Sequence, residues 1–344
     1  MKPFLARLKR LFALSFAVIA ASCCFCLICA CVSDGYGGEY ADTFKHYDGF
    51  SVNFIDVGTG DAIFINFADG KTMLIDCGEK NTRNFNSVKR YLDEYTNGIL
   101  DYLVLTHPDA DHVGNAAQII ESYIVNTAFV PYINERLRGN FNLYNQAYTL
   151  LEESGAEIKI SAVGRNVCGE KYSFIMLSPN AKGTTDSAYD TFNSYEDPPD
   201  GVRNDISPII YLEYMGVRFI LTGDAGFSQE KVALDNVKTG ITDGVLQNKG
   251  KDKINLTDID FLKVSHHGSN GASGAEFLQA LSPKNAVISV GGDNAYGFPT
   301  KDTLSRIAAA NENCSVYLTS VCGTVSVFVD ESGRAAVHTA SAAA

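Results

Sequence analysis

Hydrophobic and polar positions follow the same order twice along the chain after residue 47. In the first block, short apolar runs separated by glycine-containing turns predict β-strands, and apolar residues at helical spacing predict amphipathic helices. We expect strands at 51–57, 61–66, 72–75, 100–106 and 124–131, and helices at 81–95, 112–123 and 141–153. Strands therefore come first, and strand–helix alternation follows.

The second block repeats this order after a polar stretch. Residues 178–204 are rich in Asp, Ser and Thr and contain Pro198 and Pro199, so we expect a long loop that is functional or disordered. Before this stretch we expect a strand at 172–177. After it we expect strands at 208–214, 218–221, 259–264, 285–290, 315–319, 324–329 and 335–338, and helices at 229–236, 272–281 and 301–311. Two such blocks predict an α+β chain whose two mixed sheets each carry helices on the outer face. The predicted fold is one four-layer αββα sandwich over 47–339, with no strand order implied.

The first 32 residues have a different character. Four cations, Lys2, Arg7, Lys9 and Arg10, precede an apolar run over 11–32, as in segments that the export machinery reads. Three interpretations stay open: a cleaved signal peptide, a lipoprotein leader with Cys31 as the lipidated residue, and one uncleaved membrane anchor. Each places the remaining chain outside the cytoplasm, membrane-anchored or secreted. We expect 33–46 to be a linker and 340–344 a mobile tail.

Charge restricts the partners. The formal net charge is −12, and leaving out the four leader cations makes it −16. No long Lys/Arg run follows the leader, so any nucleic acid would have to bind through a local basic patch or bound metal. Nothing in the sequence calls for an obligate protein partner.

Cysteine usage gives little indication of chemistry. Five of the nine cysteines lie in the leader, and the others are Cys77, Cys168, Cys314 and Cys322. These four form no CxxC pair, so we expect no thiolate zinc site. Cys314 and Cys322 are either a disulfide across neighbouring strands or isolated buried thiols.

Four of the six histidines lie at the ends of predicted strands beside Asp, Gly or Ser. The densest cluster is His107-Pro-Asp109-Ala-Asp111-His112, which follows a buried strand. Alternate residues of an extended loop point to one side, and the turn into a helix brings His112 round to them. An N-cap would explain one Asp but not two Asp and two His, so this segment predicts a metal site.

Three other segments supply candidate partners. Asp224 follows a strand that ends in Thr-Gly, and one carboxylate there can bridge two divalent ions. His266-His267 end another apolar strand, and the small residues Gly268 and Ser269 let the backbone approach a ligand. Asp76 ends a hydrophobic strand and is placed to hold a metal-binding histidine by a hydrogen bond. Asp56 and Asp61 flank a glycine turn and are either supporting residues of the site or turn residues.

These motifs resemble the metallo-β-lactamase superfamily in order and context. More narrowly, they look like the extracellular hydrolase domain of ComEC-type competence proteins. The segments that carry the resemblance are 54–62, 74–78, 106–112, 221–224 and 265–269, and it covers nearly all of 47–339.

The resemblance implies a dinuclear site. His107 and Asp109 would bind one ion, Asp111 and His112 the other, and Asp224 would lie between them. Either His266 or His267 would complete the set of ligands of the second ion, and Asp111 and Asp224 would be the catalytic carboxylates. Because Asp109 stands where the superfamily usually has His, manganese and magnesium are plausible beside zinc. Asn204 and Ser207 match polar residues of ComEC-type domains and would touch substrate or orient a ligand.

The chain departs from that pattern at one motif. The stretch that contains Asn294 and Tyr296 resembles an Asn-x-Tyr-Gly-His-Pro segment of the family, but Phe298 stands in place of the His. If that His assists catalysis, this chain is slower, altered in substrate or inactive. ComEC-type proteins also attach this domain to a multi-helix channel, whereas the only long apolar segment here is the leader.

Three functions are compatible with these residues. The resemblance favours an exported metal-dependent phosphodiesterase or nuclease related to DNA uptake, and the negative charge argues against DNA. A hydrolase of a small phosphoester or cell-envelope component is the alternative within enzymes. A surface binding module built on a decayed hydrolase is the third, and the complete ligand set argues against it.

Overall fold

The computed structural model describes residues 47–241 and 253–340. The predicted leader and linker, 1–32 and 33–46, and residues 341–344 of the predicted tail lie outside this part. Within the described residues, no helix has the length and apolar composition needed to cross a membrane.

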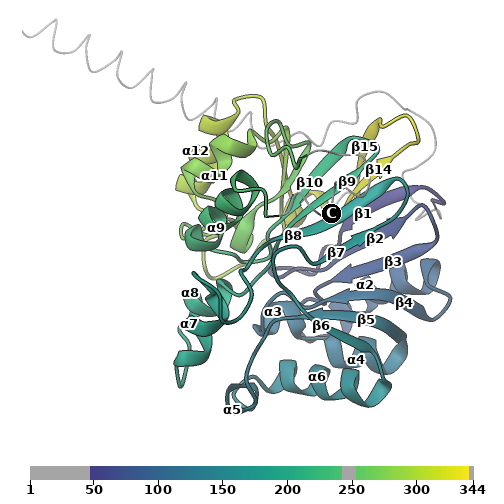
Figure 1. Ribbon diagram of the computed structural model, residues 1–344. Helices are drawn as coiled ribbons and strands as arrows, with labels where there is room; N and C mark the ends of the chain where they lie inside the picture. Colours follow the sequence, from purple (N-terminus) through teal and green to yellow (C-terminus); the bar gives the residue numbers. More distant parts are fainter. Residues whose placement is uncertain (1–46, 242–252, 341–344) are drawn as a thin grey trace, which may run out of the picture.

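The first sheet has eight strands in the order β15-β14-β1-β2-β3-β4-β5-β6 (Figure 1). Its strands are β1 Phe50–Phe54, β2 Ile63–Phe67, β3 Lys71–Ile75, β4 Ile99–Val104, β5 Ile124–Val130, β6 Glu157–Ile160, β14 Val325–Val329 and β15 Ala335–Thr339. Strands β3 to β6 pair in parallel, and the remaining pairs are antiparallel. The sheet is therefore mixed, as the sequence predicts.

The second sheet has seven strands in the order β13-β12-β11-β10-β9-β8-β7. They are β7 Asn166–Cys168, β8 Tyr172–Ser178, β9 Ile209–Tyr214, β10 Val217–Leu221, β11 Phe261–Lys263, β12 Asn285–Ile288 and β13 Ser315–Leu318. Strands β10 to β13 are parallel to one another, and β7, β8, β9 and β10 pair antiparallel in sequence order.

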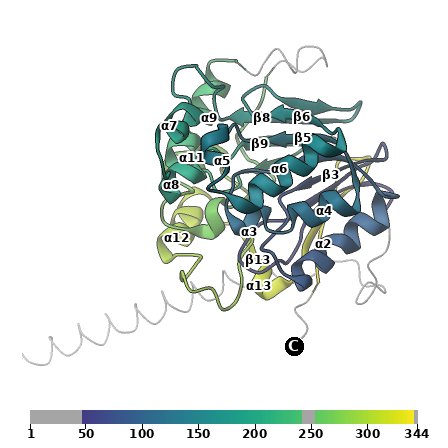
Figure 2. The ribbon, with the colours of Figure 1, turned by 90° about the horizontal axis from the view of Figure 1, so that it is seen from below.

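Helices cover the outer face of each sheet (Figures 1 and 2). On the first sheet and beyond its edge they are α2 Thr82–Tyr95, α3 Ala110–Val113, α4 Ala116–Ser122, α5 Glu135–Arg138 and α6 Asn142–Ser154. The later helices are α7 Ala188–Ser194, α8 Asp200–Asn204, α9 Phe227–Lys238, the 3-10 turn η1 Ser265–Gly268, α11 Ala275–Leu281, α12 Lys301–Ala310 and α13 Thr319–Cys322.

Three apolar cores separate the four layers. Alternate residues of one strand enter different cores: on β9, Leu212 packs between the sheets, while Tyr211 packs under the outer helices. The outer core of the first sheet combines residues such as Phe64 with Val88 and Tyr144 of its helices. Strands covered on both faces read as nearly continuous apolar runs. This layering confirms the predicted four-layer αββα sandwich.

Three local expectations were wrong or incomplete. The stretch 178–204 is not a plain loop, because Ser187 caps α7 and Phe192 of that helix is buried in the outer core. The expected helix 112–123 divides into α3 and α4 at Asn115, whose buried side chain donates to Cys77 O and Glu79 O. Strands β6 and β7 were not anticipated.

The C-terminal strands also depart from a simple pair of blocks. β14 and β15 join the first sheet beside β1, and Ala340 continues this pairing by donating its N–H to Thr324 O. Cys314 and Cys322 are both buried, and each is a thiol rather than half of a disulfide. The isolated-thiol alternative is the one that the structure contains.

Candidate metal centre

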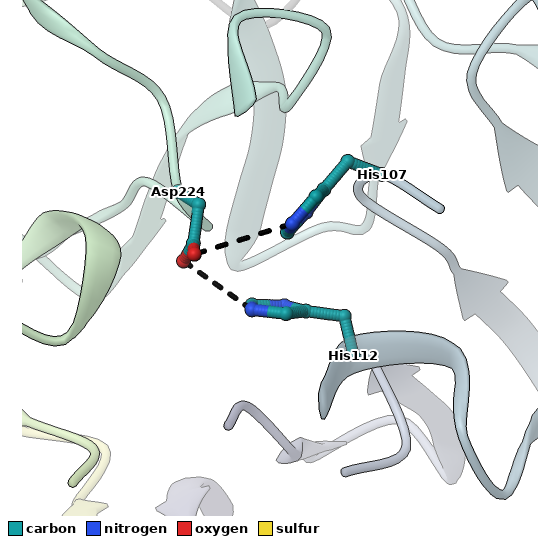
Figure 3. Close-up of side chains that lie close together, drawn as sticks. All are labelled: His107, His112 and Asp224. Atoms are coloured by element: carbon teal, nitrogen blue, oxygen red, sulfur yellow. Dashed lines mark ion pairs between the residues drawn. The ribbon is translucent and has the colours of Figure 1, made fainter. Parts of the chain in front are cut away.

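The candidate residues come from loops that follow β3, β4, β10 and β11. β3 and β4 are parallel in the first sheet, and β10 and β11 are parallel in the second, so the carboxyl ends of each pair lie at one edge. The loops from both sheets meet there. Figure 3 shows His107 and His112 pointing toward Asp224 from the opposite sheet.

Three side chains form one group of potential ligands in the cluster. Asp111, His112 and His267 each offer one ligand atom, and these atoms lie within 4.8 Å of one another. His267 Nε2 is 3.3 Å from Asp111 Oδ2 and 3.4 Å from His112 Nε2. Asp224 Oδ1 lies 3.3 Å from His112 Nε2, which joins the carboxylate to this group.

The two adjacent histidines occupy different places. His267 is buried, and its Nδ1 lies 2.8 Å from Ser289 O, so that Nε2 faces the cluster. His266 is 30% exposed, and its Nδ1 lies 3.0 Å from Ser269 Oγ. The geometry therefore favours His267 for the shell with Asp111 and His112, and puts His266 at the rim.

Both histidines have positive φ angles, 47° for His266 and 53° for His267. Non-glycine residues adopt this conformation at a cost and concentrate at functional sites. Gly268 continues the turn with a φ of 85°. A glycine is needed there, because a Cβ would lie 2.5 Å from Pro299 Cβ.

His107 belongs to a second group, because its ligand atom and those of His112 and Asp224 also lie within 4.8 Å of one another. Its Nδ1 lies 3.0 Å from Thr106 Oγ1 and 3.2 Å from Ser207 Oγ, which fixes the ring. Its Nε2 is 3.8 Å from Asp109 Oδ2 and 4.0 Å from Asp224 Oδ2. Asp224 thus lies between the His107 side and the His112 side.

The carboxylate of Asp109 contacts both His107 and the guanidinium group of Arg203. Its Oδ1 pairs with Arg203 Nε at 2.9 Å, while Oδ2 faces His107. Arg203 lies on α8, one residue before Asn204, whose side-chain nitrogen is 3.2 Å from His266 Nδ1. The stretch 178–204, expected to be a loop, thereby places two polar side chains at the rim. Sequence analysis assigned no role to Arg203, although it directly precedes Asn204.

Asp76 is fully buried and contacts the cluster through His112. Its Oδ2 accepts hydrogen bonds from His112 Nδ1 at 2.7 Å and from Thr106 Oγ1 at 2.6 Å, and its Oδ1 accepts from Thr106 N. A carboxylate on Nδ1 directs Nε2 of the same ring toward a metal. Asp76 orients His112 in this way.

A buried ion pair lies beside the cluster. Lys263 Nζ is 2.7 Å from Asp61 Oδ2, and both side chains are almost completely excluded from solvent. Asp61 Oδ1 is 3.9 Å from His267 Nδ1, and Lys263 also donates to Gly223 O next to Asp224. Sequence reasoning missed Lys263. The available signal was a lysine inside the expected apolar strand 259–264.

The remaining predicted residues lie farther out. Asn294 uses its side chain to bond the backbone of its own loop, and Tyr296 is 74% exposed. Tyr296 connects to the cluster only through ring contacts with Phe298 and then His266.

The pKa values of His107 and His112 shift in opposite directions. Burial and the neighbouring His112 lower the pKa of His107 to about 4, so its ring is neutral near pH 7. Burial acts to lower the pKa of His112 as well. The carboxylates of Asp224, Asp111 and Asp76 outweigh burial there and raise the pKa of His112 well above its usual value. A surplus of buried negative charge therefore surrounds His112 and favours a cation.

Two unsatisfied atoms test whether the residues suit a metal. His107 Nε2 and Asp224 Oδ1 are buried, and neither makes a hydrogen bond to any described residue. Buried polar atoms are normally paired, and imidazole nitrogen with carboxylate oxygen is a donor set for divalent transition metals. The residues therefore fit a metal ion, and the Asp-rich composition suits manganese or magnesium as well as zinc.

The chain is similar in sequence to two bacterial proteins. The chain is 27% identical over 276 residues to ComE operon protein 3 of Bacillus subtilis (strain 168), which covers 74% of this chain and 30% of the relative. It is 26% identical over 274 residues to Recombination protein 2 of Haemophilus influenzae, which covers 78% of this chain and 28% of that one. The chain thus spans less than a third of the length of either relative.

Among solved structures, the chain is similar to Igni18, a metallo hydrolase from Ignicoccus hospitalis, with a TM-score of 0.43 and 13% identity over 83% of this chain and 98% of that one. This likeness is too low to carry a functional argument. Residues 55–292 match the family model of the metallo-beta-lactamase superfamily. Since that model spans more than half of the chain, the chain belongs to the metallo-β-lactamase superfamily and is a distant relative of the competence proteins.

Proposed function

We propose that the chain is a dinuclear metal-dependent phosphodiesterase that works outside the cytoplasm. We propose further that its natural substrate is a nucleic acid, which makes it a nuclease. The observation that carries the proposal is the position of Asp224, with one carboxylate oxygen 3.3 Å from His112 Nε2 and the other 4.0 Å from His107 Nε2. A carboxylate shared by two sets of donors is what a pair of cations requires.

The residues divide into two shells. His107 and Asp109 would hold one cation, and Asp111, His112 and His267 the other, with Asp224 common to both. When bound, two divalent cations lower the pKa of water to near neutrality and offset the charge of a phosphoryl group. Zn²⁺, Mn²⁺ and Mg²⁺ all remain compatible with the donor set.

The protein's own part is to hold these donors in place. Asp76 keeps the Nδ1 proton of His112, and Ser289 O accepts the Nδ1 proton of His267, so both Nε2 atoms face inward. Thr106 and Ser207 fix His107 in the same way. His266 stands at the rim with Nε2 3.7 Å from Asp224 Oδ2, where it can meet a substrate oxygen or its leaving group.

The choice of a phosphodiester rests on the relatives. One matched protein is described as a recombination protein and another, of Neisseria gonorrhoeae, as competence protein ComA, and DNA is the phosphodiester polymer that such processes handle. A small phosphoester is the second candidate, and the net charge of −12 favours it because an acidic protein repels polyanions.

The leader supports the location. Its basic residues and apolar run are typical of an exported chain held at the membrane as an anchor or a lipoprotein, or released after cleavage. The membrane would then be a partner through the N-terminal segment alone.

A substrate comparison tests the proposal. The purified full chain with Mn²⁺ or Zn²⁺ should hydrolyse methyl p-nitrophenyl phosphate and single-stranded DNA, and Asp224→Ala should abolish both reactions without changing the circular dichroism spectrum. Hydrolysis of the chromogenic ester alone would favour the small-phosphoester alternative. Absence of hydrolysis with either substrate and either metal would contradict the proposal.

A further inference from the structure

Two aromatic rings form a stack that leads outward from the rim of the metal centre. The rings of Tyr296 and Phe298 are nearly parallel, with an interplanar angle of 17° and centroids 5.4 Å apart. Phe298 meets the ring of His266 edge-on at 5.6 Å, and His266 Nε2 is 3.7 Å from Asp224 Oδ2. The stack is therefore separated from the bridging carboxylate by a single side chain.

The outermost ring is open. Tyr296 is 74% exposed, the largest exposed fraction among the large hydrophobic side chains that the structure describes as exposed. One face of its ring rests on Phe298, so the opposite face is available to solvent. Phe298 itself is partly buried against the outer core of the second sheet. A partly buried inner ring thus supports an exposed outer one.

The loop that carries both rings is fixed in its shape. Asn294 donates to Gly291 O and to Phe298 O, and its Oδ1 accepts from Phe298 N at 2.8 Å. Gly291 N donates to Thr59 Oγ1 at one end of the loop, and Thr300 N donates to Gly268 O at the other. The loop is tied at both ends to segments that flank the cluster, so these hydrogen bonds hold the backbone from which both rings extend.

An exposed aromatic ring beside a hydrolytic centre is suited to stack on another planar ring. Base–aromatic stacking stabilises single-stranded nucleic acid on proteins in a sequence-tolerant way, because every base has a π-face. The acidic chain offers no long basic run to track a phosphate backbone. Stacking, which needs no positive charge, is therefore the more suitable attachment here.

We propose that Tyr296, supported by Phe298, is a stacking platform for an unpaired nucleobase of a single-stranded nucleic acid whose backbone lies at the metal centre. This proposal rests on the proposed function and names its substrate class. Tyr296 is two ring contacts away from His266. The stacked base therefore belongs to a nucleotide adjacent to the one whose phosphodiester bond is cleaved.

The proposal also gives Phe298 a role. In the family stretch that this loop resembles, a His occupies that position, and a Phe there supplies the inner ring on which Tyr296 rests. Its replacement of the His changes substrate contact and does not by itself indicate loss of activity.

Binding of two fluorescein-labelled strands of equal length tests the platform. One is an oligothymidylate and the other carries the same sugar–phosphate backbone with abasic tetrahydrofuran residues. Dissociation constants are measured by fluorescence anisotropy with the full chain in Ca²⁺, and cleavage of both strands is followed separately in Mn²⁺. We expect the oligothymidylate to bind about tenfold more tightly.

Matched variants locate the effect. Tyr296→Ala should bring the two affinities to within about twofold, with the abasic strand unaffected, and Tyr296→Phe should retain the preference. Ile124→Ala is the control, because Ile124 is 64% exposed and begins β5 at the edge opposite to the site. It should leave both affinities unchanged.

The outcomes separate this proposal from the proposed function. A thymidylate preference that Tyr296→Ala abolishes supports the platform even if neither strand is cleaved, and absence of cleavage would then count against the nuclease alone. Equal binding of the two strands, binding of neither, tighter binding of the abasic strand, or a preference that survives Tyr296→Ala would overturn the platform, whether or not the strands are cleaved.

Discussion

The carboxylate of Asp76 accepts a hydrogen bond from Nδ1 of His112 at 2.7 Å, in a position where both side chains are fully buried. This bond fixes the ring so that Nε2 faces Asp224, 3.3 Å away. The orientation of the candidate metal centre therefore depends on a residue that would not itself bind metal.

Replacement of Asp76 should weaken metal binding. In Asp76→Asn the amide no longer holds the Nδ1 proton of His112 as strongly, and loss of such a partner typically lowers metal affinity 10–100-fold. Titration of the metal-free full chain with Mn²⁺ or Zn²⁺ by calorimetry measures this change. Asp56→Asn is the control, because the carboxylate of Asp56 accepts from Gly58 N and pairs with the exposed side chain of Arg83 rather than with a histidine of the cluster. Equal affinities of Asp76→Asn and the unaltered chain would rule out the orienting role.

The adjacent histidines should behave differently. His267→Ala removes a buried donor 3.3 Å from Asp111 Oδ2 and should reduce the bound metal by about one ion per chain. His266→Ala, at the rim, should keep the metal content and lower kcat. Metal analysis by mass spectrometry, together with hydrolysis of methyl p-nitrophenyl phosphate, compares the two variants. If His266→Ala lost the ion and His267→Ala kept it, the assignment would be reversed.

Much of this centre was predictable from sequence because its donors follow buried strands. A buried strand precedes each of three donor segments: Asp76, the run from His107 to His112, and Asp224. The carboxyl ends of parallel strands lie at the same edge of a sheet. The choice between His266 and His267 was not predictable. Both residues adopt left-handed backbone in the same turn, and only the packing of Ser289 and Ser269 around them separates the two rings.

The fold shows a similar division. Strand positions and the four layers follow from apolar runs that are buried on both faces. The crossing of β14 and β15 to the first sheet is decided by long-range pairing with β1, which no local pattern contains. The helix α7 was missed because its polar surroundings concealed two buried aromatic residues, Tyr189 and Phe192.

Lys263 and Asp61 should depend on each other for stability. Removing one partner of a buried ion pair leaves an uncompensated charge and typically costs about 3–5 kcal/mol, whereas replacing both with neutral groups is often nearly neutral. We expect Lys263→Met and Asp61→Asn each to lower the free energy of unfolding by that amount, and the double variant to recover most of it. Urea denaturation of the four proteins gives the coupling. Additive losses would show that the two charges act independently.

Glu230 should make stability depend on pH. Its carboxylate is buried and accepts hydrogen bonds from Gly274 N and from Ser273 N. Burial raises the pKa of Glu230 to about 7 against the opposing effect of these donors. The folded state therefore holds the proton to higher pH than the unfolded state, so this contribution to stability is lost as pH rises from about 4.5 through about 7.

The matched variant Glu230→Gln isolates this effect. The difference in unfolding free energy between the unaltered chain and the variant should shift by roughly 3 kcal/mol between pH 4 and pH 8, in favour of the variant at high pH. Urea denaturation with a chelator in both samples excludes metal binding. A difference that is constant over this range would mean that the pKa of Glu230 is not raised.

The measurement that tests the central claim most directly is the number of ions bound by the metal-free full chain after reconstitution with Mn²⁺ or Zn²⁺, compared with Asp224→Ala. A dinuclear centre bridged by Asp224 predicts about two ions per chain, and fewer in the variant while its circular dichroism spectrum is unchanged. Binding of no ion by the unaltered chain, or the same two ions in Asp224→Ala, would contradict the account.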